Sequence, residues 1–214
     1  MLSCVRSQKK MENRRGSWYT YKERLRFDRS ERTYAMKNIL FIGTGGTIAS
    51  EMSDGALSPA LTAAQLLHHI PEVSDICRVD AVQLFTLDST DITPTHWLRI
   101  ADEIINNYDR YDGFVIAHGT DTLAYTAAAL SYLIQNSRKP IVITGAQKPI
   151  GFDTTDSKQN LTDSFICAAS GLSGVLVVFG GHVLLGTRAR KTRTKSFSAF
   201  SSPNYPPLAT AQTG

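Results

Sequence analysis

Two threonine-bearing turns offer the side chains best suited to chemistry in this 214-residue sequence. Residues 43–47 read GTGGT and end at Thr47, and residues 118–122 read HGTDT and contain Thr120 and Asp121. Each turn follows a run that is apolar at consecutive positions, which is typical of a buried parallel strand. Because open α/β sheets bind ligands beyond the carboxyl ends of such strands, the two hydroxyls indicate chemistry at that edge rather than packing alone.

The glycines around Thr47 do not form a dinucleotide-binding fingerprint. The pattern G-x-G-x-x-G fails at Ile48, and no acidic residue ends a second strand about twenty positions later. The glycines instead let the backbone turn tightly and approach a small ligand. Thr47 is therefore expected at the edge of the sheet, either as a reactive hydroxyl or as an ordinary cap or turn residue.

The second turn allows several interpretations. Asp121 lies where a helix begins, so it can cap that helix, or it can face the crevice and hold a substrate ammonium. His118 stands where a general base would be useful. A histidine at a strand end is, however, more often a packed and hydrogen-bonded residue.

Two further segments complete the polar set. Residues 87–94 follow a strand and open a helix, where Ser89 can bind a carboxylate or simply cap the helix. Residues 186–191 read GTRARK and end at Lys191, and a lysine can supply the help that a threonine hydroxyl needs to become a nucleophile. The charge run around Lys191 also has a plainer explanation as a solvated face.

The elements that position these residues alternate along the chain. Strand-like runs lie near residues 38–43, 79–85, 113–118, 140–144 and 174–179. Helical patterns separate them, and one helix starts at Thr93 and Pro94. The alternation predicts an α/β fold, a mostly parallel sheet flanked by helices. Three apolar stripes are interpreted as core: Trp97, Ile100, Ala101, Ile104 and Ile105; Leu123, Ala127, Leu130 and Ile134; and Leu161, Phe165, Ala168 and Leu172.

The net charge of +4 belongs to the start of the chain. Residues 1–35 carry ten Lys/Arg and four Asp/Glu, whereas residues 36–214 carry thirteen and fifteen. The basic character is therefore no argument for nucleic-acid binding by the body of the protein. Residues 1–35 are predicted to be a basic, disordered leader, with an over-long reading frame or an amphipathic targeting segment as alternatives. Residues 36–214 are predicted to form the folded domain.

Other features of the sequence bear on the cellular location of the protein and on its mobile or irregular segments. Three scattered cysteines predict neither a disulfide framework nor a metal site, and no apolar run is long enough to span a membrane, so a cytoplasmic protein is expected. Residues 50–59 carry polar, Gly and Pro residues directly after the first turn, which predicts a mobile lid over the site. Residues 186–207 are expected to be irregular.

Together the four polar segments resemble the bacterial-type L-asparaginase family, in particular its cytoplasmic type I branch. The resemblance covers residues 37–210 and rests on four motifs in the family's order: residues 44–49 (TGGTIA), 88–91 (DSTD), 118–122 (HGTDT), and Gly186 with Lys191 five positions later. The combination is highly specific, whereas any one motif alone is weak. The resemblance implies a larger N-terminal and a smaller C-terminal α/β domain, assembled as dimers or tetramers.

The resemblance also implies roles for individual residues. Thr47 is the nucleophile, and Thr120 with Asp121 and Lys191 forms the second catalytic group. Asp121 also holds the substrate's α-ammonium. The α-carboxylate is bound by Ser89 with the backbone around Asp88 and Thr90, and the backbone near Gly119 and Ala146 lines the pocket. The implied reaction converts L-asparagine and water to L-aspartate and ammonia and needs no metal and no organic cofactor.

The sequence departs from the family pattern in two respects. The lid contains no tyrosine to activate Thr47, and the C-terminal domain is expected to be missing, so activity of this chain alone stays open. Two alternatives follow: an amidotransferase subunit that generates ammonia for tRNA-dependent amidation, and an inactive domain that binds aspartate or asparagine. The preference for asparagine over glutamine is also open, because one methylene is typically worth only about 1–3 kcal/mol.

Overall fold

A computed structural model describes residues 2–3, 11–12, 18–19, 36–53 and 56–211. Most of the leader that is predicted to be disordered, residues 1–35, lies outside the described residues. Three short strands are described within it: β1 (Leu2–Ser3), β2 (Met11–Glu12) and β3 (Trp18–Tyr19). β2 pairs with β3, and β1 adds to the edge of the central sheet through β14 (Ala209–Ala211).

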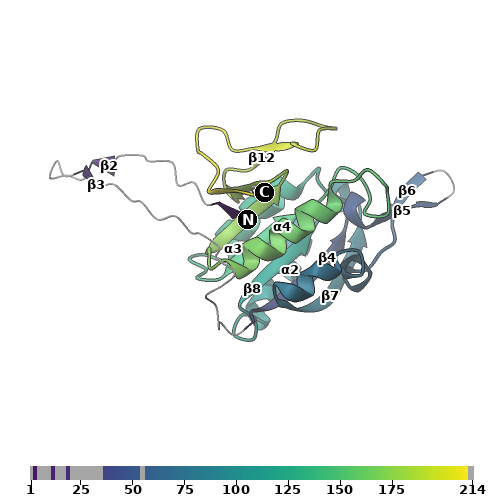
Figure 1. Cartoon of the computed structure of the whole chain (residues 1–214), viewed down its shortest axis with the longest axis horizontal. Helices are drawn as coiled ribbons and strands as arrows, with labels where there is room; N and C mark the ends of the chain where they lie inside the picture. Colours follow the sequence, from purple (N-terminus) through teal and green to yellow (C-terminus); the bar gives the residue numbers. More distant parts are fainter. Residues whose placement is uncertain (1, 4–10, 13–17, 20–35, 54–55, 212–214) are drawn as a thin grey trace.

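Five adjacent parallel strands form the larger part of an eight-stranded sheet, as the apolar runs predict (Figure 1). They are β4 (Asn38–Gly45), β7 (Arg78–Leu87), β8 (Gly113–Ala117), β9 (Pro140–Thr144) and β10 (Gly174–Phe179). Each neighbouring pair in the order β10-β9-β8-β4-β7 is parallel. Every residue of β8 and β9 is buried, which explains their unbroken apolar sequences.

Two antiparallel strands that the sequence analysis missed continue the sheet beyond β10. β11 (His182–Leu185) returns beside β10 through Gly180 and Gly181, whose φ angles are 56° and 75°. Only glycine adopts such angles without strain, so this pair was the available signal for a hairpin turn. β14 then pairs with β11.

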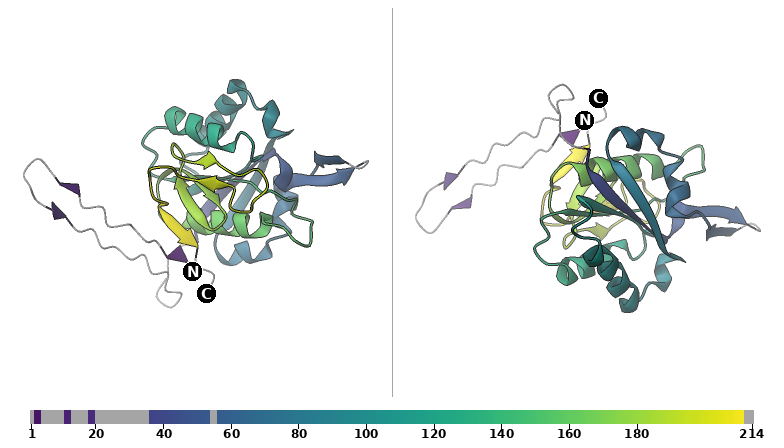
Figure 2. Two further views of the ribbon diagram at one scale, coloured as in Figure 1. Left: turned by 90° about the horizontal axis from the view of Figure 1, so that it is seen from above. Right: turned by 90° about the horizontal axis from the view of Figure 1, so that it is seen from below.

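Helices cover both faces of the sheet, which gives three layers (Figure 2). α1 (Ala63–Leu67) and α4 (Ser157–Ala169) pack on one face, in a core that includes Phe41 and Phe165 with ring centroids 5.4 Å apart. α2 (Pro94–Asn106) and α3 (Leu123–Leu133) pack on the other face. The predicted α/β sandwich is therefore confirmed.

The residues of the predicted helical stripes are buried or partly buried, except for one that is exposed. Ile100, Ala101 and Ile104 of α2 lie in the core, but Ile105 is 54% exposed. Ile105 follows Ile104 by one residue, which turns its side chain about 100° further around the helix and away from the sheet. At the end of α4 the helix stops at Ala169, so Leu172 packs partly buried from the loop that follows.

The strand order reverses next to β4. From β4 the chain runs through α1 to β7 at one edge, and from β7 it returns through α2 to β8 on the other side of β4. Ligands of open α/β sheets bind beyond the carboxyl ends of the strands at such a reversal. The topology therefore directs attention to the turns that follow β4 and β8.

Besides the β2–β3 pair, two small hairpins are described outside the main sheet. β5 (Ser50–Ser53) pairs with β6 (Ala56–Pro59) and projects from the body of the domain (Figures 1 and 2). The segment predicted as a mobile lid therefore forms a paired hairpin in its described part. β12 (Arg190–Lys191) pairs with β13 (Phe200–Ser201), so residues 186–207 are more regular than expected. Three short 3-10 helices complete the fold: η1 (Thr47–Ala49), η2 (Pro71–Asp75) and η3 (Ser89–Asp91).

Candidate active site

The turns after β4, β7 and β8 meet at the reversal of strand order. A Cβ atom placed on Gly46 would lie 2.3 Å from the Gly119 nitrogen, so the two backbones touch. A Cβ atom on Gly119 would lie 2.6 Å from the Ser89 hydroxyl oxygen. Glycine is therefore required at both positions, and the close approach brings the neighbours Thr47 and Thr120 to the same edge of the sheet.

The turn after β9 joins this group. A Cβ atom on Gly145 would lie 2.3 Å from the carbonyl oxygen of His118 and 3.4 Å from the Cγ2 atom of Thr120. Ala146, the next residue, is fully buried. The turns that follow four neighbouring parallel strands, β9, β8, β4 and β7, therefore lie close together.

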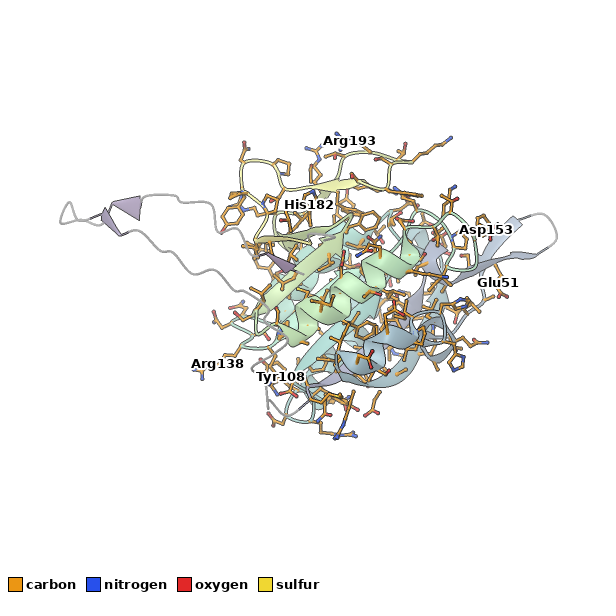
Figure 3. All side chains as sticks on the ribbon, in the orientation of Figure 1. Glu51, Tyr108, Arg138, Asp153, His182 and Arg193 are labelled. Carbon is orange, nitrogen blue, oxygen red and sulfur yellow. The ribbon has the colours of Figure 1, made fainter. Side chains whose placement is uncertain are left out.

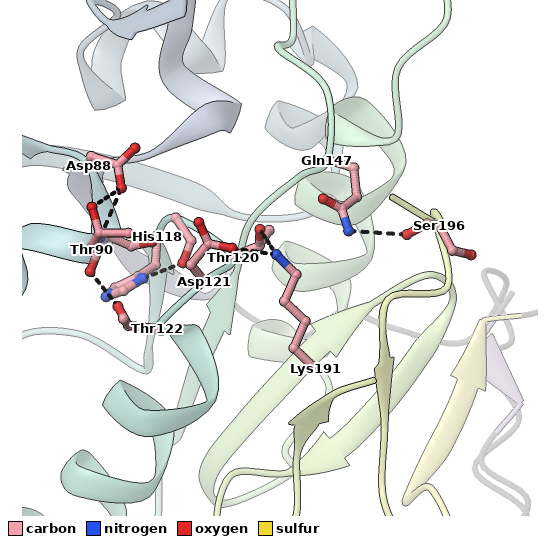
Figure 4. A network of polar contacts seen from close by, with 11 residues as sticks. Asp88, Thr90, His118, Thr120, Asp121, Thr122, Gln147, Lys191 and Ser196 are labelled. Atoms are coloured by element: carbon pink, nitrogen blue, oxygen red, sulfur yellow. Dashed lines mark hydrogen bonds and ion pairs between the residues drawn. The ribbon is translucent and has the colours of Figure 1, made fainter. Parts of the chain in front are cut away.

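Lys191 connects the far end of the chain to the β8 turn. Its Nζ donates a hydrogen bond of 2.8 Å to the Thr120 hydroxyl and lies 2.6 Å from Oδ1 of Asp121 (Figure 4). The Lys191 side chain is 17% exposed and that of Asp121 59%, so the ion pair sits at the mouth of the site. Asp121 does not cap the helix that follows, because α3 begins at Leu123 after Thr122. The structure therefore brings together three of the four residues predicted to be catalytic.

Thr47 follows Gly46, which contacts the β8 turn, and its side chain takes part in none of the hydrogen bonds of this group. It is the first residue of η1 and is partly exposed, and its hydroxyl bonds to no other residue in the described part of the chain. The nearby Thr44 has a different task, because its buried hydroxyl donates to the Ala117 carbonyl and ties β4 to β8 at 2.8 Å. Of the two threonines in the first turn, Thr47 is thus the one whose hydroxyl is available to a ligand.

In the turn after β7, Thr90 is hydrogen-bonded within the turn itself, and Ser89 is the second residue of the predicted site. Asp88 accepts hydrogen bonds of 2.8 Å from both the backbone N–H and the hydroxyl of Thr90. These bonds engage the Thr90 N–H group that the resemblance assigns to a substrate carboxylate. Ser89 is 3% exposed and is held from the other side by Thr122, whose hydroxyl donates to the Ser89 carbonyl at 2.7 Å.

Two polar residues that the sequence analysis missed hold the β9 turn. Asp156 is buried and accepts backbone N–H bonds from Gln147 at 3.0 Å and Lys148 at 3.1 Å. Asn160 donates to the Gly145 carbonyl at 2.9 Å and accepts from the Gly180 N–H at 3.0 Å. Both residues come from the start of α4, where a polar Asp-Ser pair ahead of an apolar stripe was the only local signal.

His118 is packed as the structural interpretation of this residue predicts. It is fully buried, and both ring nitrogens are bonded, Nδ1 to the Gly119 carbonyl at 2.7 Å and Nε2 to the Thr126 hydroxyl at 2.9 Å. Burial lowers the pKa of His118 from 6.5 to about 4, so the imidazole is neutral near pH 7. A buried ring with both nitrogens engaged is poorly placed to exchange protons with a ligand.

The described residues contain neither a cluster that could hold a metal ion nor a candidate membrane-spanning helix. No group of three or more His, Cys, Asp or Glu side chains among them is arranged to hold a metal ion. Within the same part of the chain, no helix is both long and apolar enough to cross a bilayer.

With the geometry established, comparison with known proteins decides the family. The sequence model described as "Asparaginase, N-terminal" matches residues 38–214. The chain belongs to the asparaginase family. An L-asparaginase from Thermococcus kodakarensis is 40% identical over 176 residues, which cover 80% of this chain and 52% of that protein.

Two further proteins are similar to this chain to about the same degree. A glutamyl-tRNA(Gln) amidotransferase subunit from Pyrococcus abyssi is 40% identical over 184 residues, covering 81% of this chain and 42% of that protein. The crystal structure of L-asparaginase I from Vibrio cholerae superposes with a TM-score of 0.78 at 41% identity, covering 84% of this chain and 55% of that one. The chain thus spans about half the length of the relatives it matches.

Proposed function

We propose that this asparaginase-family chain carries the catalytic half of an amidohydrolase that converts L-asparagine and water to L-aspartate and ammonia. The observation that carries the proposal is the contact of Lys191 with both Thr120 and Asp121, one residue away from the Gly46–Gly119 contact. A threonine hydroxyl held by a lysine, together with a second threonine hydroxyl that is unengaged at the neighbouring turn, is one arrangement that suits nucleophilic cleavage of an amide.

In the proposed reaction the Thr47 oxygen attacks the side-chain amide carbonyl. A carbon–oxygen bond forms, and the Thr47 proton passes through the Thr120 hydroxyl, held by Lys191, to the amide nitrogen. The carbon–nitrogen bond then breaks and ammonia leaves. A water molecule attacks the resulting ester along the same relay, releases aspartate and restores Thr47. The positive charge of Lys191 favours the transient negative charge on the relay oxygen.

The substrate's amino-acid end would bind across the β7 and β8 turns. Asp121 Oδ1 is engaged by Lys191, which leaves Oδ2 for the α-ammonium. The Ser89 hydroxyl is proposed to bind the α-carboxylate, with Asp88 and Thr90 shaping the turn that presents it. The backbones of Gly119 and Ala146 would line the side of the pocket nearest the scissile amide.

The nucleophile is tested by following ammonia release from asparagine with Thr47→Ala and Thr47→Ser variants of the purified chain. Thr47→Ala is expected to abolish release, because it removes the attacking oxygen, whereas Thr47→Ser keeps an oxygen and a fraction of the rate. Equal rates for the parent and Thr47→Ala would refute the assignment of Thr47.

A second candidate function is supply of ammonia to a glutamyl-tRNA amidotransferase. Its support is the similarity to the Pyrococcus abyssi amidotransferase subunit, which equals the similarity to the Thermococcus kodakarensis L-asparaginase. Stable association with tRNA or with a second protein of an amidotransferase, together with preference for glutamine, would favour this function. Saturable aspartate binding in calorimetry without ammonia release would instead favour an inactive binding domain.

Location and assembly are part of the same proposal. We place the protein in the reducing cytoplasm, because the buried Cys77 is a thiol outside any disulfide. We also propose that it works as a homo-oligomer with a small-molecule substrate and without nucleic acid or membrane as partner. Light scattering of the purified protein measures the assembly directly.

A further inference from the structure

Hydrogen bonds link three side chains, Trp97, Thr126 and His118, in a line that runs from α2 to the turn after β8. The indole Nε1 of Trp97 on α2 donates to the Thr126 hydroxyl on α3 at 2.9 Å. The same hydroxyl lies 2.9 Å from Nε2 of His118, and Nδ1 of His118 lies 2.7 Å from the Gly119 carbonyl oxygen. His118 and Thr126 are both fully buried, whereas Trp97 is partly buried (Figure 4 shows His118).

The donor and acceptor properties of these groups determine which atom carries the proton in each of the three hydrogen bonds. A carbonyl oxygen only accepts, so Nδ1 of His118 must carry the proton that bonds to Gly119. Because burial keeps the ring neutral, Nε2 is then unprotonated and accepts from the Thr126 hydroxyl. Trp97 only donates, so the Thr126 oxygen accepts from the indole. The three bonds therefore point one way, from α2 towards the β8 turn.

We propose that His118 is a positioning residue, held in one tautomer by Thr126 and Trp97, that sets the orientation of the Gly119–Thr120 peptide. The peptide group is planar, so fixing the Gly119 carbonyl also fixes the direction of the Thr120 N–H and the position of the Thr120 Cα atom. The Thr120 side chain is thereby aimed at Lys191. The claim that this orientation of Thr120 matters for catalysis rests on the proposed amidohydrolase function.

Sterically matched variants of Thr126 test the role. Thr126→Val keeps the shape of the side chain but removes the hydroxyl, whereas Thr126→Ser keeps the hydroxyl. Thr126→Val is expected to lower kcat for ammonia release about tenfold or more, since small displacements of a catalytic group are costly, with KM changed by less than about twofold. Thr126→Ser is expected to stay within about threefold of the parent. Trp97→Phe, which removes only the first donor, is expected to fall between them.

A spectroscopic readout separates this role from simple loss of folding and from failure of the proposed function. Long-range proton–nitrogen NMR correlations report the tautomer of His118 without substrate. A proton on Nδ1 in the parent, and a shifted Thr120 amide signal in Thr126→Val but not in Thr126→Ser, are expected. A proton on Nε2, or an unchanged Thr120 amide signal in Thr126→Val, would overturn the proposal. A parent chain that shows the expected NMR signals but releases no ammonia would overturn the amidohydrolase function and leave the positioning of Thr120 standing.

Discussion

The Nζ atom of Lys191 lies 2.8 Å from the Thr120 hydroxyl, although 71 residues separate the two. The β12–β13 hairpin makes this approach possible, because Lys191 stands opposite Phe200. Phe200 is buried against Phe179 of β10, with ring centroids 4.8 Å apart, and so anchors the hairpin to the sheet. Apolar packing of Phe200 thus fixes the position of its cross-strand partner Lys191.

Removing the Lys191 ammonium is expected to abolish most of the proposed activity. Lys191→Met keeps an unbranched apolar stem but leaves Thr120 without its donor, and ammonia release from asparagine is expected to fall about 100-fold or more. Lys195→Met is the control, because Lys195 is exposed on the same hairpin and has no described partner. Similar rates for the two variants would contradict a catalytic role of Lys191.

The contact between the first two turns predicts a large loss of stability on adding one methyl group. Gly46 and Gly171 both have φ near +80°, but a Cβ on Gly46 would overlap the backbone of Gly119, whereas one on Gly171 would meet nothing within 4 Å. Gly171→Ala therefore measures the strain of a positive φ without any new contact, about 1–2 kcal/mol. Gly46→Ala is expected to cost at least about 2 kcal/mol more in urea unfolding, because of this overlap and because the ψ angle of Gly46, 176°, lies in a region that is essentially confined to glycine. Equal costs would mean that the two turns do not touch.

Much of the fold follows from local sequence, and the site only partly does. Unbroken apolar runs such as residues 113–117 identify a buried parallel strand, because both faces of such a strand are covered. β14 spans only Ala209–Ala211 and gives no such signal. Its pairing depends on where β11 runs, which is a tertiary property.

The same distinction separates Thr120 from Lys191. Thr120 follows a recognisable strand, so its place at the sheet edge is predictable from the residues themselves. Lys191 lies in a basic run whose position depends on Phe200 packing against Phe179. The residues alone mark Lys191 as a possible activating group or as part of a solvated face, and only the family resemblance decides between these two interpretations. Asp156 and Asn160 were not predicted from the sequence, because their partners are backbone groups of turns that lie eight or more residues away in sequence.

Asp156 is expected to contribute far more to stability than its neighbour Asp153. Asp156 is buried and its carboxylate accepts from two backbone N–H groups, whereas Asp153 is exposed on the loop before α4 (Figure 3). Asp156→Asn weakens charge-assisted bonds that hold the β9 turn, and a loss of about 1.5–3 kcal/mol in urea unfolding is expected. Asp153→Asn is expected to change stability by less than about 0.5 kcal/mol. A small effect at Asp156 would show that other contacts hold the turn.

The depressed pKa of His118 predicts how the fold responds to acid. The pKa of the buried imidazole is about 4, below its usual value of 6.5, so the unfolded chain binds a proton more readily than the folded chain between these values. The contribution of His118 to stability is therefore complete above pH 6.5 and is lost as the pH falls towards 4. The loss amounts to about 3 kcal/mol, because one pKa unit corresponds to about 1.4 kcal/mol.

Urea unfolding of matched histidine variants between pH 7 and 4 isolates this effect. His118→Asn removes the titrating ring and is expected to flatten the fall in unfolding free energy across that range, whatever its stability at pH 7. His68→Asn, at an exposed position on the surface, is expected to keep the pH dependence of the parent. Carboxylates titrate in all three proteins, so their contribution cancels in the comparison. Identical pH dependence in His118→Asn and the parent would mean that the imidazole takes up its proton equally well in the folded and unfolded chains. That result would contradict a buried, neutral His118 ring at the start of the β8 turn.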